Sequence, residues 1–171
     1  MLTEIRMATP EDMEAVAKIY SHYVLNSVAT FEEVPPAADY WQQRLSDLTA
    51  SGLPFLVAEV DGAVVGYAYA GPFRPKPAYR HTLEDSIYLA PDWLGRGIGR
   101  KLLTALIEKC TEAGYRQMIA VIADTGLQSS LALHKSLGFT AAGQLVQVGF
   151  KHGRWVDTYL MQRPLSAIEN A

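Results

Sequence analysis

A glycine-rich basic segment, Gly95-Arg96-Gly97-Ile98-Gly99-Arg100-Lys101, is the part of the sequence whose composition most clearly indicates chemistry. Glycines let the backbone approach a ligand closely, and the free N–H groups at the start of a helix attract phosphate. Three cationic side chains lie in the same short segment. The segment therefore predicts a pyrophosphate-binding turn. The alternative is a tight connection between a strand and a helix, with its basic side chains in solvent.

A dinucleotide-binding fold is a rival explanation for such a turn. Its fingerprint is G-x-G-x-x-G, usually after the first strand of the fold. Here the spacing is G-x-G-x-G, and the segment lies past the middle of the 171 residues. We therefore do not expect a nucleotide-dependent reductase.

Two side chains that can move protons lie on either side of the glycine-rich segment. Glu84 precedes it on a predicted strand, and the two-residue period places Glu84, Ser86 and Tyr88 on one face. His134 follows it on a predicted helix, and imidazole titrates near neutral pH. Glu84 is a candidate general base, although a carboxylate at a strand end can also pair with Arg80. His134 is a candidate proton donor or a structural histidine.

Two basic stretches are candidates for holding an anion. Arg74 and Lys76 belong to a proline-rich stretch, residues 73–81, just upstream of Glu84. A second basic turn contains Lys151, His152 and Arg154. If the two stretches converge, they suit carboxylate, phosphinate or sulfoximine oxygens. The alternative is a pair of solvated surface loops.

Hydrophobic periodicity and turn residues predict the elements that position these side chains. Strands are expected at residues 2–7, 55–60, 63–70, 83–89, 118–123, about 142–148 and 155–161. Helices are expected from Thr9-Pro10, from Pro35-Pro36, from the glycine-rich turn and over residues 129–137. The order β-α-α-β-β-β-α-β-α-β-β predicts an α/β (α+β) fold with a mixed, mostly antiparallel sheet and helices on both faces.

Composition excludes several other classes of protein. Apolar residues make up 49% and charged residues 19% of the chain, so a globular domain is expected over residues 1–171. A net charge of -3 gives no reason to expect nucleic acid or an anionic membrane as a partner. Without a signal-peptide core, and with Cys110 as its single cysteine, the chain is expected to be cytoplasmic.

The segment 92–103 resembles the acetyl-CoA pyrophosphate loop of the GCN5-related N-acetyltransferases. Residues 131–139, Leu-Ala-Leu-His-Lys-Ser-Leu-Gly-Phe, resemble the second signature of that superfamily. Residues 68–74, 84–89 and 149–155 are similar to the phosphinothricin and methionine sulfoximine acetyltransferases. The resemblance covers residues 3 to 163. The sequence departs from the superfamily at Leu94, where Gln or Arg is usual, and near Leu127, where Asn is common.

The resemblance implies acetyl-CoA as cosubstrate and direct transfer to the amine of a small anionic amino acid, with no metal. Glu84 then acts as base, and His134 acts on the leaving thiolate. The cofactor lies on the backbone of Ile87, Tyr88 and Leu89 and on the loop made of Leu94, Gly95, Arg96, Gly97, Ile98, Gly99, Arg100 and Lys101. The substrate is held by Phe31, Arg74, Lys76, Tyr88, Lys151, His152 and Arg154. A homodimer is expected, as is common among relatives.

Two alternatives retain the fold. An enzyme that acetylates a protein N-terminus or another small amine would use the same cofactor, but acidic residues and an open groove would replace the basic loops. A non-catalytic acyl-CoA-binding module would need neither Glu84 nor His134. The buried position expected for Cys110 argues against a covalent acetyl-cysteine intermediate.

Overall fold

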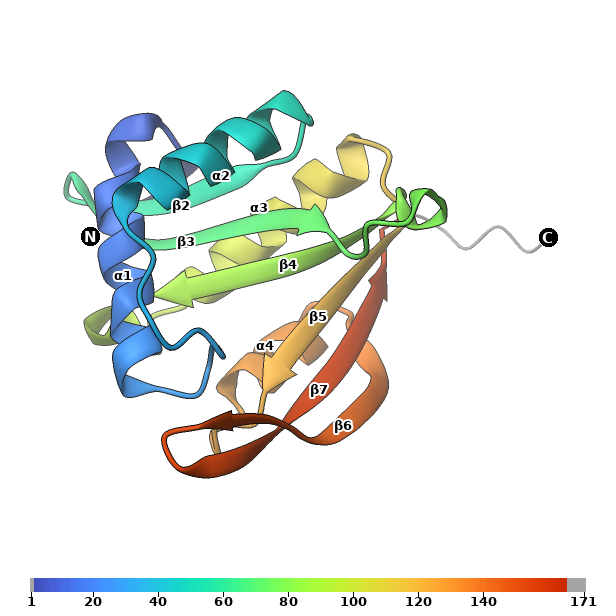
Figure 1. Ribbon diagram of the computed structural model, residues 1–171. Helices are drawn as coiled ribbons and strands as arrows, with labels where there is room; N and C mark the ends of the chain where they lie inside the picture. Colours follow the sequence, from blue (N-terminus) through green and yellow to red (C-terminus); the bar gives the residue numbers. More distant parts are fainter. Residues whose placement is uncertain (1, 166–171) are drawn as a thin grey trace.

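A seven-stranded sheet runs through the computed structural model, which describes residues 2–165, and helices pack on both faces of the sheet (Figure 1). The strands are β1 (Thr3–Met7), β2 (Phe55–Val60), β3 (Ala63–Pro72), β4 (Thr82–Leu89), β5 (Gln117–Ala123), β6 (Thr140–Lys151) and β7 (Arg154–Pro164). The helices are α1 (Met13–Asn26), α2 (Ala38–Ala50), α3 (Ile98–Glu112) and α4 (Ser129–Ser136). The predicted order of elements and the predicted fold class are confirmed.

Several predicted boundaries were wrong. Pro10–Asp12 forms a short 3-10 turn, so α1 begins at Met13, and α2 begins only at Ala38 because the proline pair before it is not helical. The last two strands extend to Lys151 and from Arg154, which leaves a two-residue turn at His152 and Gly153. Both turn residues have positive φ, 50° and 73°, as a tight hairpin requires.

The strand order is β1-β2-β3-β4-β5-β7-β6, and β4 and β5 form the parallel pair in this sheet. These two strands pair only over Thr82–Glu84 and Gln117–Ile119. Beyond that point β4 continues against β3, whereas β5 continues against β7. The sheet therefore opens between β4 and β5, and Figure 1 shows the two strands diverging.

The hydrophobic core explains which helices cover which face. Helix α3 buries the predicted stripe of Leu102, Leu103, Leu106, Ile107 and Cys110. Helices α1 and α2 bury their own apolar stripes against the opposite face, over β2, β3 and β4 (Figure 1). Within residues 2–165, no helix combines the length and the apolar character that crossing a membrane requires.

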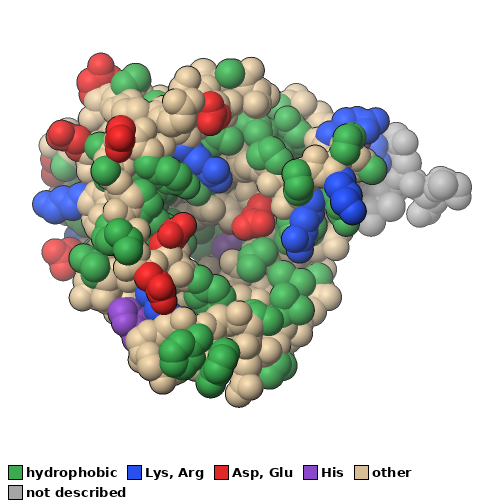
Figure 2. All heavy atoms as spheres, in the orientation of Figure 1, with side chains coloured by type: hydrophobic (Ala, Val, Ile, Leu, Met, Phe, Trp, Pro, Cys, Tyr) green, Lys and Arg blue, Asp and Glu red, His purple; other side chains and the backbone are tan. Residues whose placement is uncertain are grey.

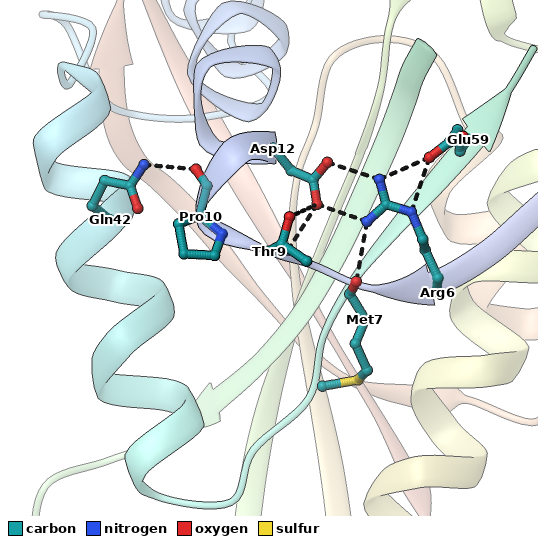
Figure 3. A network of polar contacts seen from close by, with 7 residues as sticks. All are labelled: Arg6, Met7, Thr9, Pro10, Asp12, Gln42 and Glu59. Carbon is teal, nitrogen blue, oxygen red and sulfur yellow. Dashed lines mark hydrogen bonds and ion pairs between the residues drawn. The ribbon is translucent and has the colours of Figure 1, made fainter. Parts of the chain in front are cut away.

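A polar network centred on Arg6 fastens the first strand to the rest of the fold (Figure 3). The Arg6 guanidinium donates to both carboxylate oxygens of Asp12 at 2.8 Å and to Glu59 on β2 at 2.9 Å. Gln42 of α2 donates to the Pro10 carbonyl at 2.7 Å. These contacts join β1, the turn before α1, β2 and α2, far from the opening between β4 and β5.

Candidate active site

A cavity of about 620 Å³ lies where β4 and β5 part. Its walls come from both strands, from the start of α3, from α4 and from the segment that follows α1. The space-filling view is hollowed at the centre of this face, with acidic and basic side chains on the walls of the hollow (Figure 2). Both predicted catalytic residues, Glu84 and His134, line the cavity.

Glu84 is the last residue of β4 that pairs with β5, so its carboxyl group lies where the two strands begin to diverge. Burial, and secondarily the negative charge of Asp85, raise the pKa of the Glu84 carboxyl above its ordinary value. Arg74 and Arg44 oppose this shift, because their positive charges favour the ionised carboxylate. A half-buried carboxyl with a raised pKa is suited to accept a proton near neutral pH.

His134 is buried on α4 and is held by both of its ring nitrogens. Nε2 lies 2.7 Å from Oδ2 of Asp85, and Nδ1 lies 2.7 Å from the carbonyl oxygen of Ser130. A carbonyl oxygen can only accept, so Nδ1 carries a hydrogen. The short contact between Nε2 and the carboxylate requires a second proton. The His134–Asp85 pair therefore holds one proton between its two groups.

The pKa of His134 is the result of two opposing effects. Burial lowers the pKa, whereas the hydrogen bond to Asp85 and the negative charge of that residue raise it. The net direction is upward, and it agrees with the geometry, because a carboxylate at 2.7 Å with almost no solvent access stabilises an imidazolium strongly.

The start of α3 lies on the wall of the cavity, and within residues 2–165 no side chain caps its N–H groups. Gly97 is the N-cap residue, with a left-handed φ of +79°, and Gly97 and Gly99 both line the cavity. Arg100 lines it too and donates to the Ser136 hydroxyl at 3.0 Å. The 15-residue helix directs its positive dipole end at this wall. These features are suited to an anionic phosphate.

The remaining predicted cofactor residues divide into two groups. Ile87, Tyr88 and Leu89, together with Leu94 and Gly95, line the cavity. The β4 backbone of residues 85–89 has no strand partner on the β5 side, so it can pair with an extended ligand, although the Leu89 carbonyl accepts from the Tyr23 hydroxyl.

The other three residues of the loop are not among those that line the cavity. Ile98 is part of the core. The Arg96 guanidinium stacks over the Trp93 ring at 4.7 Å, and Lys101 is exposed.

Of the predicted substrate residues, Phe31 and Tyr88 line the cavity. The Phe31 ring rests on the backbone of Gly149, where an added Cβ would lie 2.4 Å from the Phe31 Cζ. The glycine therefore lets the β6–β7 hairpin support the wall that Phe31 forms.

The basic residues predicted to hold the substrate do not line this cavity in the structure. Lys151 is buried, and its Nζ donates to the Thr30 carbonyl at 2.8 Å, so it anchors the segment that carries Phe31. Arg154 donates to the Asp124 carbonyl, while Lys76 and His152 are exposed. Arg74 is exposed, but it is the one among these residues whose charge acts on Glu84.

Two charged residues that act on the predicted catalytic side chains escaped prediction. Asp85 follows Glu84 on β4, so its side chain points to the opposite face, and only the packing of α4 reveals its partner His134. Arg44 lies on the buried face of α2, 40 positions before Glu84, and no local pattern relates the two.

Comparison with known proteins agrees with this geometry. A family described as the acetyltransferase (GNAT) domain matches residues 5–160. A phosphinothricin N-acetyltransferase of Alcaligenes faecalis is 51% identical over 95% of this chain and 83% of its own. An L-methionine sulfoximine/L-methionine sulfone acetyltransferase of Salmonella typhimurium is 39% identical over 94% of both chains.

A solved structure is similar to this chain over almost its whole length. The phosphinothricin acetyltransferase of Sinorhizobium meliloti, in complex with AcCoA, is 50% identical and superposes with a TM-score of 0.93 over 97% of this chain and 90% of that one. Three findings indicate the same family. They are the match along almost the whole chain, the opening between β4 and β5 and the glycine-rich start of α3. The chain belongs to the GNAT acetyltransferases.

Proposed function

We propose that this protein transfers the acetyl group of acetyl-CoA to the amine of a small anionic amino acid, of the phosphinothricin or methionine sulfoximine and sulfone type. The two enzymes described above, whose sequences are 51% and 39% identical to this chain, are named for such compounds. One observation carries the proposal. The Glu84 carboxyl, with its raised pKa, stands at the parting of β4 and β5 and within electrostatic reach of two arginines.

The cavity suits acetyl-CoA as the acyl donor. The free backbone of β4 offers hydrogen bonds to the pantetheine arm, and the N-terminus of α3 offers N–H groups to the pyrophosphate. Both ligand segments would then run along one continuous wall of the cavity, which ends near Glu84 and His134. No metal takes part in the proposed reaction.

The proposed reaction is a direct transfer within a ternary complex. Glu84 removes a proton from the ammonium group, directly or through water, and the free amine attacks the thioester carbonyl carbon. The C–N bond forms and the attacking nitrogen loses its second proton to water, while the C–S bond breaks. The departing thiolate takes a proton that the His134–Asp85 pair holds, and water then returns a proton to that pair. Cys110 takes no part, because its thiol is buried and burial raises its pKa to about 12.

The anionic end of the substrate is the part that the basic residues recognise. Arg74 and Lys76 lie in the connection between β3 and β4, and the proposal assigns them to the anionic end of the substrate. In this assignment Phe31 and Tyr88 form apolar walls. The roles of Lys151 and Arg154 in the proposal are indirect, because their contacts with the Thr30 and Asp124 carbonyls hold the β6–β7 hairpin in place. His152 lies in the turn of the same hairpin.

A thiol-release assay with acetyl-CoA tests the function. The acceptor panel contains methionine sulfone, methionine sulfoximine, phosphinothricin, an uncharged amine of similar size and a peptide with a free N-terminus. We expect the highest kcat/KM with the anionic amino acids. Preference for the peptide would replace this proposal with protein N-terminal acetylation. Acetyl-CoA binding without turnover of any acceptor would indicate a non-catalytic acyl-CoA-binding module.

We further propose a cytoplasmic homodimer in which residues 1–171 form one catalytic domain. Strand β6 is an edge of the sheet, and nearly all of its side chains are exposed. The hairpin displays exposed apolar side chains, Leu145, Val146, Val148, Phe150 and Trp155. Hydrophobic side chains gather at this end of the molecule in Figure 2. An exposed edge strand with such a surface is suited to contact a second copy of the chain.

A further inference from the structure

Arg44 presents a guanidinium group that has no hydrogen-bond or ion-pair partner within residues 2–165. Its Nε atom is shielded from solvent and has no acceptor. A buried donor without an acceptor costs free energy comparable to that of a lost hydrogen bond. The two terminal nitrogens are not among the shielded donors, so the acceptor of a ligand can reach them.

The surroundings of Arg44 fix where that ligand would lie. The Cζ atom lies 5.0 Å from the centroid of the Tyr69 ring, over its face. A terminal nitrogen, Nη2, lies 3.6 Å from where a Cβ on Gly71 would be, so the absence of a side chain at Gly71 leaves room for the guanidinium. The tip of Arg44 is therefore held against β3 by contacts that leave its hydrogen-bond donors free.

Gly71 is the cross-strand partner of Glu84 in the β3–β4 ladder. Directly opposed residues place their side chains on the same face of a sheet as near neighbours. The Arg44 guanidinium therefore lies beside the Glu84 carboxyl on the α2 side of the sheet, and its charge lowers the pKa of that carboxyl. Yet the two groups form no ion pair within 4.0 Å. A positive and a negative group are therefore neighbours on one face of the sheet, with their charged atoms more than 4.0 Å apart.

We propose that Arg44 is a specificity-determining residue that binds the α-carboxylate of the acceptor amino acid, while Glu84 receives the proton of its ammonium group. In an α-amino acid the ammonium and carboxylate groups are bonded to the same carbon, so the residues that bind them must be close neighbours. The guanidinium fork matches a carboxylate bidentately. The inference rests on the proposed function and deepens it, since Arg74 and Lys76 then remain for the phosphinate, sulfoximine or sulfone oxygens of the side chain.

A purely structural Arg44, packed on Tyr69 to complete the core, is the competing explanation. It predicts that replacement of Arg44 affects every acceptor equally, through stability or through the shape of the site. Binding of the α-carboxylate predicts an effect that depends on whether the acceptor carries that carboxylate. Substrates that differ only in this group separate the two explanations.

The experiment uses Arg44→Met, which keeps an unbranched side chain over the Tyr69 ring and removes the charge. Two acceptors are compared, methionine sulfone and 3-(methylsulfonyl)propylamine, the same molecule without its carboxylate. We expect the ratio of their kcat/KM values to fall roughly tenfold to a hundredfold, the equivalent of a lost hydrogen bond to a charged group. Arg44→Lys should restore part of that ratio. Gln43→Met, on the exposed side of the same helix, is the matched control.

An unchanged ratio in folded Arg44→Met protein, verified by its melting temperature and acetyl-CoA affinity, would overturn the inference and leave the proposed function intact. Wild-type protein that acetylates the amine as well as it acetylates methionine sulfone would overturn it as well. Wild-type protein that acetylates neither compound would instead contradict the proposed function. The test of Arg44 would then use the best amino acid acceptor found and its decarboxylated amine, with the same expected fall in ratio.

Discussion

The Glu84 carboxyl is half-buried at the opening of the sheet, so its ionised form loses hydration and its pKa rises above 4.5. Glu84→Gln keeps the shape of the side chain and removes the proton acceptor. We expect the turnover rate at neutral pH to fall by roughly 10²–10⁴-fold. The acid limb of the wild-type pH–rate profile, where protonation of Glu84 stops the reaction, should disappear in the variant.

Acetyl-CoA affinity serves as the control for Glu84→Gln, because the proposed cofactor contacts lie on the β4 backbone and on α3. Isothermal titration should give a Kd within a few-fold of the wild-type value. A rate loss of less than about tenfold, with folded protein and normal cofactor binding, would assign the deprotonation to another residue or to water alone.

The His134–Asp85 pair predicts a pH dependence of stability. The folded pKa of His134 lies above its ordinary value of 6.5, so the folded protein binds this proton more tightly than the unfolded chain does. The resulting stabilisation is fully present below about pH 6.5 and is lost as the pH rises through the folded pKa. Urea denaturation at a series of pH values should therefore show the free energy of unfolding falling across that window.

His134→Gln isolates this contribution from the other titrating groups. The amide retains one donor and one acceptor but cannot carry the extra proton, so the difference between wild type and variant should shrink as the pH rises. Two other ionisable groups, Glu84 on β4 and the Cys110 thiol on α3, have a pKa that is raised by burial and by the charge of Asp85. A difference that stays constant with pH would show that the pair carries no additional proton.

At the scale of elements, the connection from β4 into α3 brings the phosphate-binding N–H groups to the cavity. Gly97 adopts φ +79° at the N-cap, a conformation that a β-branched residue disfavours by about 1–2 kcal/mol. Gly97→Val should therefore raise the Kd for acetyl-CoA about tenfold or more, since it moves donors that contact a charged group. Equilibrium binding of acetyl-CoA measures the effect.

Gly114→Val is the matched control, because Gly114 has φ +89° just beyond the other end of α3 and does not line the cavity. Both variants should lower the melting temperature to a similar extent. Only the variant at Gly97 should weaken acetyl-CoA binding. Equal affinities in the two folded variants would remove the start of α3 from the cofactor site.

For the whole molecule, the sheet has two edges, β1 and β6, and only β6 displays a row of exposed apolar side chains on its hairpin. We expect a dimer in solution through this hairpin. Val146→Lys, which places a charge at a side chain that is 66% exposed, should convert the dimer to a monomer. Light scattering coupled to size exclusion measures the mass.

Leu2→Lys is the corresponding control, because Leu2 is also exposed but precedes β1, at the opposite edge of the sheet. It should leave the mass unchanged. A wild-type protein that is monomeric at micromolar concentration would contradict the proposed dimer. A dimer that survives Val146→Lys would place the interface elsewhere.

The sequence by itself determined the local structure and the class of chemistry. Asp61-Gly62 takes the positive φ values, 50° and 81°, that its hairpin requires, and the stripe on α3 is buried as its period predicts. The glycine spacing before α3 indicated a phosphate ligand because the positive φ that glycine allows and the free N–H groups of a helix start are local properties of the chain. Family membership followed from the same segments and is confirmed along residues 5–160.

Only the tertiary structure decided which side chains meet. Asp85 and His134 are 49 positions apart, and Arg44 approaches Glu84 only because α2 packs over β3. Lys151 looked like a surface cation, but the hairpin buries it against the Thr30 carbonyl. Periodicity specifies which face a residue occupies, whereas the partner on that face depends on how distant elements pack, and that depends on the shape and volume of the whole core.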